Sequence, residues 1–242
     1  MYNSIIDIIL GSRTIVFQEK FTNNVEWNRK IIGPKNNPAV LIFLGRNVDF
    51  NTHSAIYKKF KNKTKIIYKL PNKLISEDID LSKKLINEIV DDVQNIIKEY
   101  DVVWCYGLSL GCLLATYVSN KFSKSINKLY LISPGSRVSD IFWDSFITKS
   151  QVKKAKANGL TSNDYKIKLK KFDPIENLNN LSHTDLKVFV GKFDAIFPYK
   201  YTKQFIDKIK QLKIPVDIKI FSCGHYVTCA IGIYLTSAKY YS

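Results

Sequence analysis

Short apolar runs recur along the chain and predict the strands of one central sheet. Continuous apolar runs of about four to eight residues, bounded by turn residues, are typical of strands that are covered on both faces. Such runs occupy residues 39–44, 65–70 and 101–106, and further strands are predicted over residues 129–133, 186–191 and 215–221. Residues 14–21 and 25–32 mix apolar and polar positions on either side of Asn23 and Asn24, which predicts an N-terminal antiparallel hairpin.

Between these runs, apolar residues recur at intervals of three and four and predict helices. In residues 81–100, Leu85, Ile89 and Val93 share one apolar face, which is typical of a helix packed against a sheet. Further helices are predicted over residues 112–118 and 199–212 and from about residue 226. Strands alternating with helices indicate an α/β fold, with a mostly parallel central sheet, helices on both faces and a single domain over residues 1–242.

One long segment interrupts the alternation. Residues 134–172 separate two predicted strands by more than one crossover helix requires, and they combine the aromatic side chains of Phe142, Trp143 and Phe146 with a lysine-rich portion. A long excursion of this kind forms either a lid over a pocket or a longer crossover helix with a loop. We expect a small helical lid or cap insertion.

Composition restricts the class of protein without selecting a function. The 242 residues are 45% hydrophobic, enough for a sizeable core, and carry a formal net charge of +16. Such a charge favours acidic partners, including an acidic carrier protein, but no pattern of a known nucleic-acid module accompanies the lysines. No apolar run is long enough to span a bilayer and no targeting segment is evident, so we expect a cytoplasmic protein.

The cysteines do not indicate a metal site. Cys105, Cys112, Cys223 and Cys229 form no CxxC pair and have no Cys/His ligand spacing, so we expect no metal and no cofactor. Cys105 and Cys112 fall on a predicted buried strand and a predicted buried helix, which favours inert thiols over a disulfide.

The strongest chemical motif lies between a strand and a helix. Gly107, Ser109 and Gly111 read G-x-S-x-G, directly after the apolar run that ends at Tyr106 and directly before an apolar helical run. A sharp strand-to-helix turn needs small residues two positions on either side of the serine, and it holds the serine at the carboxyl edge of the sheet. The backbone N–H of Leu110 can then face an oxyanion, helped by the helix N-terminus.

A serine nucleophile needs a base and an orienting carboxylate. Of the three histidines, His225 follows the last predicted strand, whereas His53 precedes the first helix and His183 lies in a polar loop. Asp194 follows the penultimate strand in a G-x-x-D segment and is the favoured acid. Two alternatives stay open: Asp140, beyond the strand that ends at Ser133, and Asp173, before Pro174.

On these motifs the chain resembles the α/β-hydrolase superfamily from about residue 39 to its end, apart from the insertion. The resemblance implies a catalytic triad in the order Ser109, Asp194, His225. It also implies an oxyanion hole formed by the backbone N–H groups of Leu110 and Arg46. The family often has His-Gly before that second donor, whereas this chain has Leu44 and Gly45.

These inferences together predict a serine hydrolase that cleaves a carboxylic ester or thioester through an acyl-enzyme on Ser109. Gly45 and the three aromatic residues of the insertion, Phe142, Trp143 and Phe146, are the candidate pocket residues. One alternative is a thioesterase or acyltransferase acting on an acyl-carrier protein. Another is a non-catalytic ligand-binding protein, because the fold by itself does not fix function.

Overall fold

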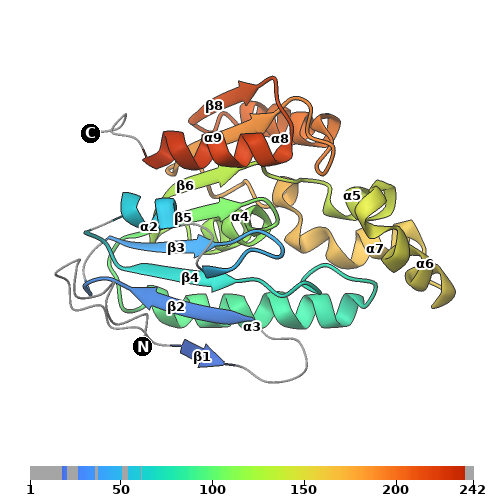
Figure 1. The fold of residues 1–242 in the computed structure, drawn as a ribbon, viewed down its shortest axis with the longest axis horizontal. Helices are drawn as coiled ribbons and strands as arrows, with labels where there is room; N and C mark the ends of the chain where they lie inside the picture. The colour runs from blue at the N-terminus through green and yellow to red at the C-terminus, as the bar shows by residue number, and fades with distance from the viewer. Residues whose placement is uncertain (1–17, 21–26, 36–37, 51–53, 61, 238–242) are drawn as a thin grey trace.

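One sheet runs through the whole molecule in the computed structural model. The structure describes residues 18–20, 27–35, 38–50, 54–60 and 62–237. Within these residues, eight strands form a sheet in the order β1-β2-β4-β3-β5-β6-β7-β8 (Figure 1). The strands are β1 (Gln18–Lys20), β2 (Asn28–Ile32), β3 (Ala39–Phe43), β4 (Lys65–Lys69), β5 (Val103–Leu108), β6 (Ile126–Ile132), β7 (Asp185–Gly191) and β8 (Val216–Phe221).

Strand direction confirms the predicted mostly parallel α/β sheet. β2 is antiparallel to both β1 and β4, and the pairings from β4 through to β8 are all parallel. The β1–β2 pair corresponds to the predicted hairpin, of which residues 14–17, 21, 25 and 26 lie outside the described part of the chain. Because the six parallel strands point the same way, the loops that follow them meet at one edge of the sheet.

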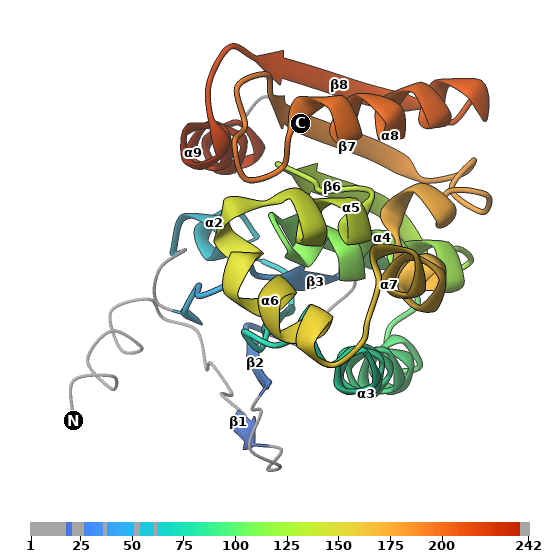
Figure 2. The same ribbon diagram turned by 90° about the vertical axis from the view of Figure 1, so that its right-hand side faces the viewer.

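Helices cover both faces of the sheet, as the alternation predicts. α2 (Ser54–Lys59) and α9 (His225–Ser237) lie on one face, and α3 (Ile79–Ile97) and α4 (Gly111–Lys121) lie on the other (Figure 2). Strand β3 contributes side chains to the core on both faces of the sheet. Leu41 and Phe43 enter one core layer, and Val40 and Ile42 enter the opposite one. Burial on both faces accounts for the continuous apolar run.

The predicted insertion is helical and lies beyond the carboxyl ends of the parallel strands (Figures 1 and 2). It comprises α5 (Val138–Asp144), the 3₁₀ turn η2 (Phe146–Thr148), α6 (Lys149–Ala157), α7 (Ser162–Leu169) and η3 (Lys170–Phe172); a further 3₁₀ turn, η4 (Pro174–Glu176), follows before β7.

Stacking and a hydrogen bond hold the insertion in place. The rings of Phe142 and Tyr165 stack with centroids 4.4 Å apart, joining α5 to α7. The hydroxyl of Tyr165 donates to the carbonyl oxygen of Ser76, 2.7 Å away in the loop after β4. The insertion therefore contacts the loop after β4, in addition to being joined by the chain to β6 and β7.

The remaining long helix, α8 (Tyr199–Gln211), packs its apolar face against β7 and buries Phe205, Ile206 and Ile209. Among the described residues, no helix combines the length and the apolar character needed to cross a membrane.

Candidate active site

Ser109 stands at a tight turn between β5 and α4. Its φ angle is +52°, in the left-handed region that non-glycine residues rarely occupy and that is often found at functional turns. Two backbone hydrogen bonds hold the turn: the N–H of Ser109 donates to Ile132 at 2.9 Å, and the N–H of Cys112 donates to the Ser109 carbonyl at 2.9 Å. The serine is thus fixed at the carboxyl edge of the sheet, where the sequence motif predicts it.

The two glycines of the motif are required by close packing. A Cβ atom at Gly107 would lie 2.7 Å from the Cβ of Ala115 and 2.7 Å from the Cα of Cys112. A Cβ atom at Gly111 would overlap the carbonyl oxygen of Phe43. Both positions therefore accept only glycine without a shift of α4, which explains the spacing of the motif.

Three side chains that are far apart in sequence meet at this edge. The hydroxyl of Ser109 lies 2.8 Å from Nε2 of His225, and Nδ1 of His225 lies 2.7 Å from Oδ2 of Asp194. His225 is the first residue of α9, directly after the β8 loop, and Asp194 follows β7. Both are buried, whereas Ser109 is half-buried and faces a cavity. The structure brings the three predicted residues into a serine–histidine–aspartate relay.

Both carboxylate oxygens of Asp194 accept hydrogen bonds. Oδ1 accepts the backbone N–H groups of Ile196 and Phe197, each at 2.8 Å, while Oδ2 accepts from His225. Burial alone would raise the pKa of Asp194, but hydrogen bonding and charge from His225, with further hydrogen bonds from Phe197 and Ser133, outweigh it. The net result is a pKa below the ordinary value, so the carboxylate is ionised and can stabilise a charged imidazole.

Ser133 is a fourth member of this network that the sequence reasoning did not identify. Its hydroxyl donates to Oδ2 of Asp194 at 2.8 Å and lies 3.1 Å from Nδ1 of His225. Ser133 is 2% exposed and lies beside Nδ1 of His225, whereas Ser109 lies beside Nε2. Ser133 therefore supports Asp194 and is shielded from a substrate. Its position at the end of a predicted strand, at the same sheet edge, is shared with ordinary turn residues and did not mark it in the sequence.

The two alternative acids lie elsewhere. Asp140 forms an ion pair with Arg137, with Oδ2 2.6 Å from Nε. Asp173 accepts the backbone N–H groups of Arg137 and Val138 at the start of α5 and of Ile175 at η4. Burial raises the pKa of Asp173, partly offset by these hydrogen bonds. Both aspartates serve the insertion, and neither hydrogen bonds to His225.

The other candidate side chains also lie away from the relay. His183 is exposed, and His53 lies outside the described residues. Cys105 and Cys112 are buried free thiols, as predicted, and burial raises the pKa of Cys105 to about 12. Across the described part of the chain, no group of histidine, cysteine and acidic side chains is arranged to hold a metal ion.

A cavity of about 300 Å³ opens in front of Ser109. Its apolar wall is formed by Ile75, Val138, Ile141, Phe142, Ile147, Ile196 and Phe197, and its polar side by Arg46, Asn47, Ser145, Thr148 and Tyr226. Residues of α5 and η2 thus form part of the wall, so the insertion covers one side of the site.

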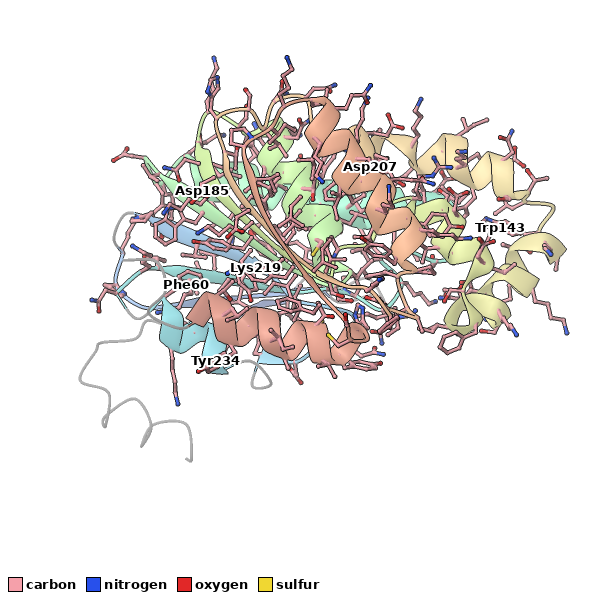
Figure 3. The ribbon with its side chains drawn as sticks, turned by 90° about the horizontal axis from the view of Figure 1, so that it is seen from above. Phe60, Trp143, Asp185, Asp207, Lys219 and Tyr234 are labelled. Carbon is pink, nitrogen blue, oxygen red and sulfur yellow. The ribbon has the colours of Figure 1, made fainter. Side chains whose placement is uncertain are left out.

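Of the pocket residues expected from the sequence, only Phe142 lines this cavity. Trp143 follows it on α5 but packs edge-on against Phe142 and Tyr165 within the insertion, at the end of the molecule where Figure 3 labels it. Phe146 is 62% exposed at the surface. A helix turns adjacent side chains about 100° apart, and sequence alone did not fix which one faces inward. Gly45 is also absent from the lining, although the Cβ it lacks would lie 3.3 Å from the Cβ of Ser109.

Two backbone amides flank Ser109 in the same cavity lining. Leu110 and Arg46 both border the space in front of the serine. Within the described residues, neither N–H donates a hydrogen bond, so both remain available to an acceptor. A Cβ added at Gly45 would lie 3.3 Å from the Cβ of Ser109, so the loop after β3 lies next to the turn at Ser109. The arrangement fits the expected pair of oxyanion donors.

The chain has many solved structural counterparts despite low sequence identity. No protein-family model and no curated protein matches it. Acylaminoacyl peptidase of Pyrococcus horikoshii superposes with a TM-score of 0.59 and 15% identity, over 93% of this chain but only 39% of the peptidase. An esterase of Pyrococcus furiosus gives 0.58 and 14%, over 94% of this chain and 92% of the esterase. Mouse alpha/beta hydrolase domain-containing protein 10 gives 0.60 and 14%, over 90% and 94%. These superpositions, taken with the strand order and the serine elbow, show that the chain has the α/β-hydrolase fold.

Proposed function

We propose that the protein is a serine hydrolase that cleaves a carboxylic ester or thioester through an acyl-enzyme on Ser109. The observation that carries this proposal is the relay itself, with 2.8 Å between Ser109 and His225 and 2.7 Å between His225 and Asp194. Both distances are within proton-transfer range, and the base is oriented by an ionised carboxylate. The esterases among the structural neighbours are consistent with this class.

The relay supports two successive acyl transfers. Ser109 Oγ attacks the carbonyl carbon while Nε2 of His225 takes the hydroxyl proton, and Asp194 stabilises the resulting imidazolium. The N–H groups of Leu110 and Arg46 bind the oxyanion. As the intermediate collapses, the bond to the leaving alcohol or thiol breaks and that group takes the proton from Nε2. Water then attacks the acyl-enzyme, His225 acts as base again, and the acid leaves with Ser109 restored.

The cavity supports a substrate with an apolar portion of limited size. The aliphatic and aromatic wall from α5, η2 and residues 196–197 suits an acyl or alkyl chain. A volume of about 300 Å³ is at the small end of the range for ligand sites, which favours short to medium chains over long lipids. The basic surface keeps the acidic carrier protein as an alternative source of the acyl group.

The competing class is a non-catalytic binding protein on the same fold. It is disfavoured because binding alone does not require a strained serine, a buried histidine and an ionised aspartate in one relay.

Labelling with a serine-directed fluorophosphonate probe tests the proposal. We expect Ser109 to be labelled in the intact protein and labelling to be lost in both Ser109→Ala and His225→Ala. Across a panel of p-nitrophenyl esters and acyl thioesters, Ser109→Ala should lower kcat/KM by about 10³ or more.

Ser162→Ala is the matched control, because Ser162 is an exposed serine at the start of α7. This variant should retain labelling and activity. Absence of labelling in the unmodified protein, together with inactivity across the whole panel, would leave the binding-protein class as the better account.

A further inference from the structure

Arg46 places a charged side chain in the lining of the cavity, where the described residues supply no acceptor for its buried Nε. It follows β3 by three positions and lines the space in front of Ser109. Its Nε atom is buried and has no hydrogen-bond partner among the described residues. The acidic side chain in the same loop, Asp49, instead forms an ion pair with Lys69 at 3.4 Å.

The rest of the lining leaves this charge uncompensated. None of the described residues that line the cavity is an aspartate or glutamate, and seven of them carry the apolar side chains named above. A guanidinium group stays charged at all ordinary pH values, and a buried donor without an acceptor costs free energy. An anionic group bound in the cavity would remove this cost. The side chain is therefore arranged for a ligand that supplies an acceptor.

We propose that Arg46 binds a carboxylate of the substrate, which makes the preferred substrate an ester or thioester that carries a second, free carboxylate. This inference rests on the proposed hydrolase function and names its substrate class. A guanidinium matches a carboxylate in both charge and forked geometry. A phosphate carries a charge of about −1.5 to −2 at neutral pH, which a single arginine would leave partly uncompensated beside the apolar wall.

The two roles of Arg46 also set the length of such a substrate. Its backbone N–H would bind the oxyanion of the reacting carbonyl and its guanidinium would bind the carboxylate, so the two substrate groups would lie no further apart than one arginine side chain spans. The carboxylate is thus separated from the ester by a short methylene chain, which the apolar wall of Ile141, Phe142 and Ile147 can cover.

Two pairs of matched esters test the inference from either side of the scissile bond. With the acid on the acyl side, monoethyl adipate is compared with ethyl hexanoate; with the acid on the alcohol side, 4-acetoxybutanoate is compared with butyl acetate. The measured quantity is the ratio of kcat/KM for the acidic ester to that for its neutral partner, followed by pH-stat titration. A ratio is used because it cancels any effect of substitution on the shared backbone donor.

We expect the ratio to exceed one in at least one pair and to fall by about 10- to 100-fold in Arg46→Gln, the range of one charge-assisted hydrogen bond. Arg46→Lys should retain part of the preference because it keeps the charge. Lys98→Gln removes the same charge at the end of α3, at the opposite edge of the sheet, and should leave the ratio unchanged.

The outcomes separate the two levels of the proposal. Hydrolysis of the neutral esters with an unchanged ratio in Arg46→Gln would overturn the carboxylate site while leaving the hydrolase intact. A uniform fall of both members of a pair would likewise overturn it and reduce Arg46 to a structural role. Failure of the unmodified protein to hydrolyse any of the four esters, without fluorophosphonate labelling, would instead remove the proposed function.

Discussion

At the scale of single residues, the site depends on how firmly Asp194 is held. Its two oxygens together accept four hydrogen bonds: two from backbone amides, one from Ser133 and one from His225. A carboxylate so fully satisfied cannot rotate away from the imidazole. It therefore fixes both the orientation of His225 and the tautomer that leaves Nε2 free for Ser109.

Replacing Asp194 tests its role in orienting the base. Asp194→Asn preserves the shape of the side chain but supplies an N–H group where an acceptor is needed, which disfavours the productive tautomer. We expect kcat on any ester that the protein hydrolyses to fall by about 10³ to 10⁴. Asp140→Asn is the control, because Asp140 contacts Arg137 and not His225. A large loss in Asp140→Asn with little in Asp194→Asn would reverse the assignment.

The shifted pKa of Asp194 also predicts a dependence of stability on pH. The folded protein lowers this pKa below its ordinary value of 3.8, so the unfolded chain binds the proton more readily. The ionised group stabilises the fold above about pH 4, and this contribution is lost as the pH falls through the lower folded pKa. The advantage of the unmodified protein over Asp194→Asn in unfolding free energy should therefore shrink from pH 6 to pH 3, as measured by urea unfolding.

Asp173 supplies a comparison of opposite sign. Burial raises its pKa in the folded state, so its protonated form is the one that the fold favours. The stability of the unmodified protein relative to Asp173→Asn should consequently rise as the pH falls through the same range. Parallel behaviour of the two variants would contradict one of the two pKa directions, and the sign of the shared trend would show which.

The catalytic candidates could be predicted from sequence because each carries a local signal. Ser109 lies in a glycine-flanked turn, Asp194 in a segment after a strand, and His225 after the last strand. Ser133 could not be assigned in this way, since its role depends on a positive φ angle of +51° and on two partners more than 60 positions away. A serine at the end of a strand has no pattern that distinguishes a partner of the relay from an ordinary turn residue.

At the scale of elements, the tight turn at Ser109 can join β5 to α4 only because α4 packs closely against β3. The Gly111 backbone contacts the Phe43 carbonyl, so α4 begins at the closest approach that a glycine permits. Gly111→Ala should therefore displace the helix and lower the unfolding free energy by more than about 2 kcal/mol.

Gly159→Ala is the matched control for this substitution. Unlike Gly111, Gly159 has a positive φ, of +76°, and nothing lies within 4 Å of the added Cβ. Its cost should be limited to backbone strain of about 1 kcal/mol. Equal losses for the two variants in urea unfolding would show that packing at the elbow is not the limiting feature.

Burial explains which elements the sequence could predict. The parallel strands β3 to β7 are mostly buried, unlike the edge strand β8, and α3 buries one regular stripe, so these elements have strong apolar patterns. By contrast, α6 buries only Val152 and Ala155, and α7 buries only Tyr165 and Leu169. Such helices leave little periodicity in the sequence, which is why the insertion could be predicted as a helical region but its helices could not be delimited.

At the scale of the whole molecule, positive charge gathers on the insertion that borders the cavity. Eight lysines fall within residues 149–171, and all eight side chains are exposed. The same stretch of sequence contains one acidic residue, Asp164. A cationic surface beside an active site raises the rate at which an acidic macromolecule docks there, and dissolved salt weakens that attraction.

This surface gives the carrier-protein alternative a measurable consequence. If the acyl group arrives on an acidic carrier, kcat/KM for a hexanoyl thioester of an acidic acyl carrier protein should fall about tenfold or more between low and ~0.5 M salt. Hexanoyl-pantetheine, which presents the same thioester without the protein, should change far less.

Replacing Lys166, Lys168 and Lys170 by glutamate should reproduce the effect of salt on the carrier substrate. The same change at Lys98, Lys121 and Lys124, exposed at the opposite edge of the sheet, should not. An equal response of both substrates to salt would show that the lysines are a general property of the surface, and that the substrate reaches Ser109 as a free small molecule.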